Sequence, residues 1–146
     1  MPDFNFEMIL SADPKKLFEL VTNYENYQKV FPDQLKNISI VSRNNFEVIT
    51  KEVLTFNTYF KNTELYQKTS HNVHYPKLFS NVIEGPFKGT VVKVTFGELD
   101  SGCKVTINAE LKISLKYKIL SPIIKNKYKN ILTSLLYKMN NIAMND

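Results

Sequence analysis

The sequence predicts an α+β domain: a curved antiparallel sheet of about seven strands, two short helices, and a long C-terminal helix across the concave face. Two patterns carry this prediction. From Cys103 to Tyr117 every odd position is apolar or aromatic and every even position is polar, which is the period of a strand with one buried face. Such a strand would extend roughly 50 Å, far beyond the usual length, so it must bend around something.

The second pattern is a helical stripe near the C-terminal end. Pro122 interrupts the alternation, and from Ile123 the apolar period changes to that of a helix. The stripe comprises Ile124, Tyr128, Ile131, Leu132, Leu135, Met139, Ile142 and Ala143. A helix of about twenty residues spans roughly 30 Å, so the sheet and the helix would enclose either a packed core or a pocket.

One strand and two short helices are predicted ahead of the main sheet. Residues 4–10 alternate as a strand with Phe, Phe, Met and Leu on one side. Asp13 suits the N-cap of a helix with Pro14 at its first position, and this helix should end near Asn23. Residues 24–32 predict one or two further helical turns, which the proline at their end stops.

The remaining strands are predicted from β-branched and aromatic runs at 38–42, 46–56, 58–69, 78–84 and 91–96. Turn signals separate the runs at 44–45, 57, 70–72, 85–86 and 100–102. Because few residues lie between the runs, the strands should form hairpins of an antiparallel meander. This order excludes a parallel, doubly wound sheet.

Size and composition favour one domain over residues 1–146 in the cytoplasm. Of the 146 residues 43% are hydrophobic and 23% are charged, which is ordinary for a soluble globular protein. The sequence contains no apolar run as long as a membrane span and no signal-peptide pattern. The lone cysteine, Cys103, excludes an intrachain disulfide and is expected to be a small buried hydrophobe.

The positive charge is concentrated near the C-terminal end. Residues 1–100 carry eleven basic and twelve acidic side chains, whereas residues 101–146 carry eight lysines and two carboxylates. Arg43 is the one arginine, which argues against specific nucleic-acid recognition because base reading usually uses the planar guanidinium. The lysine-rich C-terminal region is therefore expected to be either a solvated face or a peripheral contact with an anionic membrane.

Several stretches together resemble a known group of proteins. They are residues 14–21, 23–27 and 31–32, then 59–62, 85–89, and the strands at 92–96 and 103–115. On these stretches the chain resembles the coenzyme Q-binding START-like family and the polyketide cyclase/dehydrase family grouped with it. Both belong to the helix-grip superfamily of START and birch-pollen-allergen-like proteins. The Gly-Pro-Phe-Lys turn at 85–88 is the most specific; one departure is Val94, where such proteins often carry tryptophan.

The resemblance implies a helix-grip fold with a hydrophobic cavity between the sheet and the C-terminal helix. The function implied is binding and sequestration or transfer of a lipid, an isoprenoid quinone or a polyketide-like molecule, with no cofactor. A fully packed core stays the alternative, as does a role of the early aromatic residues in merely capping that core. The expected ligand contacts are Tyr24, Tyr27, Phe31, Tyr59, Tyr66, Asn81, Val92, Val94, Phe96, Ile107, Ala109, Leu111, Ile131, Leu135 and Met139.

Two rival functions remain open. A polyketide cyclase or dehydratase would need an acid/base residue in the cavity, and Glu52, Tyr59 and Glu84 are the first candidates, although strand glutamates usually face water. A protein-interaction module would instead expose an apolar patch. His71 and His74 have H-x-x-H spacing, but we expect them in a strand connection without a nearby carboxylate or cysteine. No metal site is therefore predicted.

Overall fold

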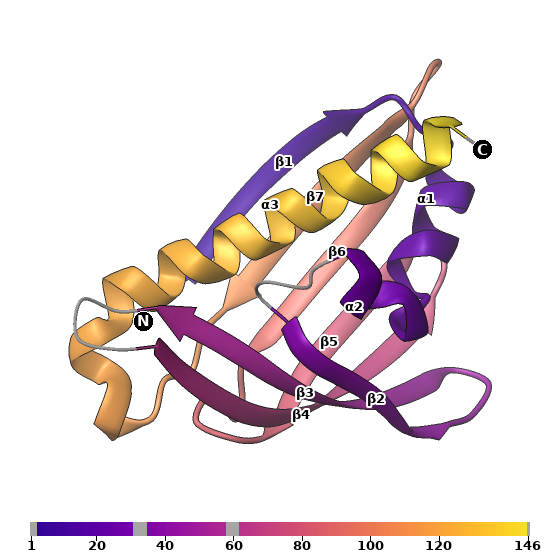
Figure 1. Ribbon diagram of the computed structural model, residues 1–146. Coiled ribbons are helices and arrows are strands. Elements are labelled where there is room, and N and C mark those ends of the chain that lie inside the picture. Colours follow the sequence, from indigo (N-terminus) through magenta and orange to yellow (C-terminus); the bar gives the residue numbers. More distant parts are fainter. Residues whose placement is uncertain (1–2, 31–34, 58–61, 146) are drawn as a thin grey trace.

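The computed structural model describes residues 3–30, 35–57 and 62–145 of the chain. Within these residues seven antiparallel strands form one curved sheet in the order β1-β7-β6-β5-β4-β3-β2 (Figure 1). The strands are β1 (Asp3–Leu10), β2 (Leu35–Arg43), β3 (Glu47–Asn57), β4 (Asn62–His74), β5 (Lys77–Glu84), β6 (Val91–Glu98) and β7 (Cys103–Glu110). The predicted fold class is confirmed.

The long helix α3 (Ser121–Asn145) crosses the concave face of this sheet (Figure 1). Its buried residues are Ile124, Leu135, Leu136, Met139 and Ala143. The predicted stripe is thus largely confirmed, except that Ile142 is 37% exposed. None of the described helices combines the length and the apolar character needed to cross a bilayer.

The short helices follow the first strand as predicted. They are α1 (Pro14–Val21), the 3-10 turn η1 (Tyr24–Asn26) and α2 (Tyr27–Val30). The Asp13 carboxylate accepts a hydrogen bond from the backbone N–H of Lys16 at 3.1 Å, so the predicted N-cap is confirmed. Helix α1 buries Leu17, Phe18 and Val21 and packs against α3.

The predicted strand over 103–117 is too long, because β7 ends at Glu110. Glu110 is also the last residue that has a partner in either neighbouring strand. It lies opposite the first residue of β1 and opposite the first residue of β6. The backbone N–H of Lys112 then donates to the Thr90 hydroxyl at 3.0 Å in place of a strand partner. Leu111 and Ile113 stay buried, but Leu115 is 85% exposed and begins the 3-10 helix η2 (Leu115–Leu120).

The predicted turn at 70–72 is also wrong, because these residues lie inside β4. They pair with β3 on one side and with β5 on the other, so their polar side chains do not interrupt the ladder. The Ser70 hydroxyl donates to the Glu47 carboxylate across the sheet at 2.6 Å. The chain instead turns at Tyr75 and Pro76, and the predicted strand start at residue 58 lies outside the described residues.

Candidate functional site

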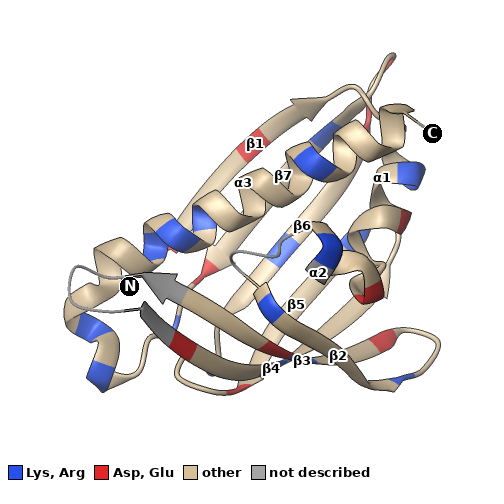
Figure 2. Cartoon of the chain, in the orientation of Figure 1, with Lys and Arg blue, Asp and Glu red and all other residues tan. Residues whose placement is uncertain are grey.

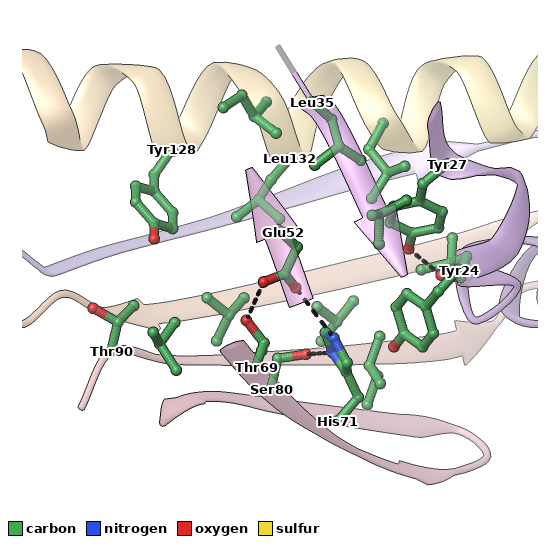
Figure 3. Close-up of a pocket in the computed structure, with 18 of the residues that line it drawn as sticks. Tyr24, Tyr27, Leu35, Glu52, Thr69, His71, Ser80, Thr90, Tyr128 and Leu132 are labelled. Carbon is green, nitrogen blue, oxygen red and sulfur yellow. Dashed lines mark hydrogen bonds and ion pairs between the residues drawn. The ribbon is translucent and has the colours of Figure 1, made fainter. Parts of the chain in front are cut away.

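The sheet and α3 enclose a cavity of about 190 Å³. Its wall consists of Val21, Tyr24, Tyr27, Leu35, Ile38, Glu52, Leu54, Gln67, Thr69, His71, Leu78, Ser80, Val82, Thr90, Val92, Val94, Ile107, Tyr128, Ile131, Leu132, Leu135 and Leu136. Most of these side chains are apolar. Figure 3 labels eight that carry polar atoms: Tyr24, Tyr27, Glu52, Thr69, His71, Ser80, Thr90 and Tyr128. The sheet and α3 are therefore not packed against each other along their whole length.

Aromatic side chains pack at two places around this cavity. Phe18 of α1 meets the ring of Phe96 edge-on, with centroids 5.3 Å apart, and meets Tyr75 at 5.1 Å. Phe87 of the β5–β6 turn meets Tyr128 edge-on at 5.6 Å. Offset and edge-on arrangements of this kind are the favourable ones for aromatic pairs. These clusters fill space that would otherwise extend the cavity.

Seven of the predicted ligand contacts lie on the cavity wall: Tyr24, Tyr27, Val92, Val94, Ile107, Ile131 and Leu135. Their position follows from strand alternation in β6 and β7 and from the stripe of α3. Their position on the wall is established, and their role as ligand contacts stays a prediction.

Four predicted contacts are buried in the core instead of lining the cavity: Phe96, Ala109, Leu111 and Met139. The sequence pattern identified the right face, but neighbouring side chains fill the space there, as Phe18 does beside Phe96. Tyr66 is 61% exposed and Asn81 also stays off the wall, because Gln67, Ser80 and Val82 next to them point inward. Phe31 and Tyr59 lie outside the described residues.

Glu52 is the residue whose environment differs most from expectation. The expected solvated strand glutamate is only 7% exposed and lies on the cavity wall. Its carboxylate accepts a hydrogen bond from the Thr69 hydroxyl at 3.1 Å (Figure 3). It also accepts one from the Thr50 hydroxyl at 2.5 Å. Thr50 and Thr69 are cross-strand partners in β3 and β4, which is why both hydroxyls reach the same carboxylate. Glu84, by contrast, is exposed and pairs with Lys68.

His71 lies in β4 and not in a strand connection, so that prediction is wrong. Its Nε2 lies 2.8 Å from the Thr50 hydroxyl and 3.9 Å from the Glu52 carboxylate, and its Nδ1 lies 2.7 Å from the Ser80 hydroxyl. Since the Thr50 hydrogen is directed to Glu52, its oxygen accepts from Nε2–H of His71. The result is a continuous chain of hydrogen bonds from Ser80 to Thr69 across three strands.

Tyr24 covers this polar chain from the helical side. Its ring stacks on His71 with centroids 4.1 Å apart, and the side chain is 2% exposed. Burial raises the pKa of the Tyr24 hydroxyl well above its usual range, with smaller effects of Tyr27 and Glu52. The hydroxyl therefore stays protonated at neutral pH and is available as a hydrogen-bond donor.

Within the described residues, three buried polar atoms on the cavity wall make no hydrogen bond of normal geometry: the hydroxyls of Tyr24 and Tyr128 and the side-chain carbonyl oxygen of Gln67. Burial also raises the pKa of Tyr128, with a further effect of Glu52, whereas the nearby Gln67 side chain lowers it as a weak hydrogen-bond partner. The Tyr24 hydroxyl is therefore the clearer unpaired donor. Tyr27 differs from these tyrosines, because its hydroxyl donates to the backbone carbonyl of Val21. Unpaired buried donors are unusual and point to a missing partner.

The described residues contain no cluster of three or more histidine, cysteine or acidic side chains suited to a metal ion. His74 is exposed and stacks on Phe46 with centroids 4.6 Å apart. Burial raises the pKa of the Cys103 thiol to about 11, so this cysteine is protonated at neutral pH. A protonated, buried thiol is a poor nucleophile.

A curved sheet closed by a long helix around an apolar cavity defines the helix-grip class of ligand-binding proteins. Residues 10–139 match the model of the family described as polyketide cyclase / dehydrase and lipid transport. Since this match covers most of the chain, the protein belongs to that family. The coenzyme Q-binding branch receives no separate support from the comparisons. The search of curated proteins finds no match.

Solved structures agree on the fold. The TTHA0849 protein from Thermus thermophilus superimposes with a TM-score of 0.82 at 13% identity, covering 98% of this chain and 97% of the other. The Zhui aromatase/cyclase from Streptomyces sp. R1128 gives 0.75 at 9% identity, with 94% and 92% covered. A START superfamily protein from Mycobacterium smegmatis gives 0.64 at 15% identity, with 98% and 97% covered. Identities this low establish the fold but no shared activity.

Proposed function

We propose that this protein binds a hydrophobic small molecule in the cavity between its sheet and α3, and sequesters or transfers it. The observation that carries the proposal is the cavity itself, which lies within the hydrophobic core and has a largely apolar wall. Each methylene moved from water into such a site contributes about 0.8 kcal/mol. Binding of this kind needs no chemistry from the protein.

The volume of the cavity favours a compact ligand. An engineered protein cavity of about 150 Å³ accommodates benzene, and pockets for drug-sized ligands begin near 300 Å³. At about 190 Å³, the cavity accommodates one or two fused rings. A long isoprenoid or acyl chain would have to extend out of it. Size therefore supports a polyketide-like ring compound over a complete quinone or lipid.

The unpaired polar atoms favour a ligand that carries oxygen. An unsatisfied buried hydroxyl costs about 1–3 kcal/mol, and Tyr24 and Tyr128 each present one. A ring compound with carbonyl oxygens would accept hydrogen bonds from both. A pure hydrocarbon would leave them unpaired, so a ketone or quinone group on the ligand is the better complement.

Native mass spectrometry of freshly purified protein tests the proposal by detecting a co-purified small molecule. Titration with 1-tetralone and tetralin, which share one bicyclic skeleton, tests the polar part. We expect the wild type to bind 1-tetralone more tightly than tetralin. The affinity for 1-tetralone should fall roughly three- to tenfold in Tyr24→Phe or Tyr128→Phe. If neither compound binds and no small molecule co-purifies, the proposed binding function is rejected.

A cyclase or dehydratase is the second candidate, favoured by the carboxylate of Glu52 within the apolar cavity. In that function the Glu52 carboxylate would take a proton from the carbon next to a ligand carbonyl. The C–H electron pair would form the double bond of an enolate, whose oxygen a tyrosine hydroxyl would stabilise. The proton on Glu52 would then pass to a departing β-hydroxyl, which leaves as water.

Deuterium exchange into 1-tetralone in heavy water tests this candidate without knowledge of the natural substrate. The wild type should exchange the hydrogens beside the carbonyl faster than buffer, and Glu52→Gln should abolish the acceleration. Glu84→Gln, which changes an exposed carboxylate, should retain it. If the wild type binds 1-tetralone without accelerating exchange, the enzymatic function is rejected and the binding function is retained.

We also propose a cytoplasmic location with peripheral contact to anionic membranes through the lysine-rich C-terminal region. The support is the excess of eight lysines over two carboxylates in residues 101–146. Lysines near an anionic surface each contribute about 1 kcal/mol at physiological ionic strength. Binding of this kind should therefore weaken steeply as salt is added.

A further inference from the structure

One side of the helix η2 is half-buried against the core, and the other side is exposed. Tyr117 and Leu120 pack against the hydrophobic core, and the Tyr117 ring lies 6.3 Å from that of Phe87. The backbone N–H of Ser114, just before η2, donates to the carbonyl of Pro86 at 2.9 Å. These contacts attach the segment to the β5–β6 turn, so its outward side chains project from a fixed backbone.

Two of those outward side chains are large and apolar. Leu115 is 85% exposed and Ile119 is 89% exposed, more than any other large hydrophobic residue among those described. The next is Ile9 at 67%, on the outer side of β1. Single exposed apolar residues are common on soluble proteins. Two in one six-residue helix, both almost fully in water, form a local apolar projection.

Basic residues are frequent in this part of the chain. Lys116 and Lys118 lie between Leu115 and Ile119 in the sequence, and Lys125, Lys127 and Lys129 follow in α3. Figure 2 shows basic segments along the first part of α3. No ion pair joins any of these five lysines to a carboxylate within the described ranges. Glu110, the nearest carboxylate along the preceding chain, lies 4.0 Å from Lys112. Positive charge therefore dominates this end of the molecule.

We propose that η2 is a docking tip for the surface of an anionic phospholipid bilayer. Leu115 and Ile119 enter the boundary between headgroups and acyl chains, while Lys116 and Lys118 contact lipid phosphates. Exposed apolar residues that alternate with lysines match both layers of such a surface. A projection also suits a deformable bilayer better than a protein partner, which would need to offer a matching pocket.

The tip lies at the end of α3 that carries part of the cavity wall. Tyr128 is seven residues beyond Ser121, the first residue of α3, which corresponds to about 10 Å along a helix. Docking through η2 would therefore hold the cavity close to the bilayer. The inference rests on the membrane contact proposed above but not on the cavity function, because a tip can bind lipid whether or not the cavity is occupied.

Co-sedimentation with vesicles tests the proposal. The wild type should bind vesicles of equal parts phosphatidylserine and phosphatidylcholine and should not bind phosphatidylcholine alone. Leu115→Ser with Ile119→Ser should weaken binding at least about tenfold, and Lys116→Gln with Lys118→Gln roughly thirtyfold. The matched controls are Ile9→Ser with Leu99→Ser, and Lys51→Gln with Lys93→Gln, which change exposed residues elsewhere and should leave binding unchanged.

Fluorescence locates the contact, because the chain contains no tryptophan. Ile119→Trp introduces one at the tip, and Leu99→Trp introduces one in the exposed β6–β7 turn. Anionic vesicles should shift the emission of Ile119→Trp to shorter wavelength, and brominated lipids should quench it, with neither effect in Leu99→Trp. The proposal is overturned by equal quenching at both positions, by equal binding to both vesicle types, or by no loss in the tip variants. Failure of the wild type to bind any vesicle would overturn the membrane contact as a whole, whereas anionic binding that the tip variants leave unchanged would overturn the tip alone.

Discussion

The three tyrosines on the cavity wall should respond to the same substitution with opposite signs. Tyr27→Phe removes the hydroxyl that donates to the carbonyl of Val21, the last residue of α1, whose carbonyl has no partner within the helix. Loss of this bond and exposure of an unpaired acceptor should cost about 1–2 kcal/mol of unfolding free energy. Tyr24→Phe and Tyr128→Phe remove hydroxyls that make no hydrogen bond of normal geometry. The unfolding free energy of these variants should stay the same or rise by up to about 1 kcal/mol.

Urea unfolding of the ligand-free protein measures these differences, and thermal unfolding should show shifts of roughly 2–4 °C per kcal/mol. Tyr137→Phe is the matched control, because this tyrosine of α3 is 55% exposed and surface changes rarely exceed about 0.5 kcal/mol. A loss above about 1 kcal/mol in Tyr24→Phe would show that its hydroxyl has a partner in the free protein. The argument for an oxygen-bearing ligand would then lose its basis.

Three further outcomes are expected. Glu52→Leu should lower the unfolding free energy by about 2–4 kcal/mol in urea titrations, because the hydroxyls of Thr50 and Thr69 lose their buried acceptor. Glu52→Gln keeps one acceptor oxygen, so its loss of unfolding free energy should be less than half of that. Asp13→Ala should cost about 1 kcal/mol in the same assay through loss of the α1 cap, and an unchanged value would contradict the cap. The pKa of Cys103, raised to about 11, makes the native state bind a proton more tightly than the unfolded chain, so stability should fall as pH rises from about 8.5 towards 11. Cys103→Ala should flatten that decline in unfolding curves measured between these pH values, and an identical decline would contradict it.

Local signals in the sequence predicted most of the fold. Asp13 and Pro14 fixed the start of α1, and the apolar stripe placed α3, because both depend on neighbours within a few residues. The end of β7 was not predictable in this way. It depends on where β1 and β6 begin opposite Glu110, which is information from distant parts of the chain.

The polar part of the candidate site was hidden for the same reason. Ser70 to Asn72 have the composition of a turn, and only their pairing with β3 and β5 shows that they continue a strand. Once that register is known, His71 and Glu52 fall on the inner face together. The apolar wall was easier to predict, because alternation identifies a face, although it does not show which inward residues border empty space.

The place of β1 at the sheet edge, paired only with β7, has a consequence for folding. About a hundred residues separate Phe4 from Ala109, its partner across the ladder. During synthesis, β1 remains without this neighbour until about a hundred further residues have been added. Such distant contacts raise the contact order and slow folding, and the apolar side of β1 stays open to chaperones and to aggregation in that interval.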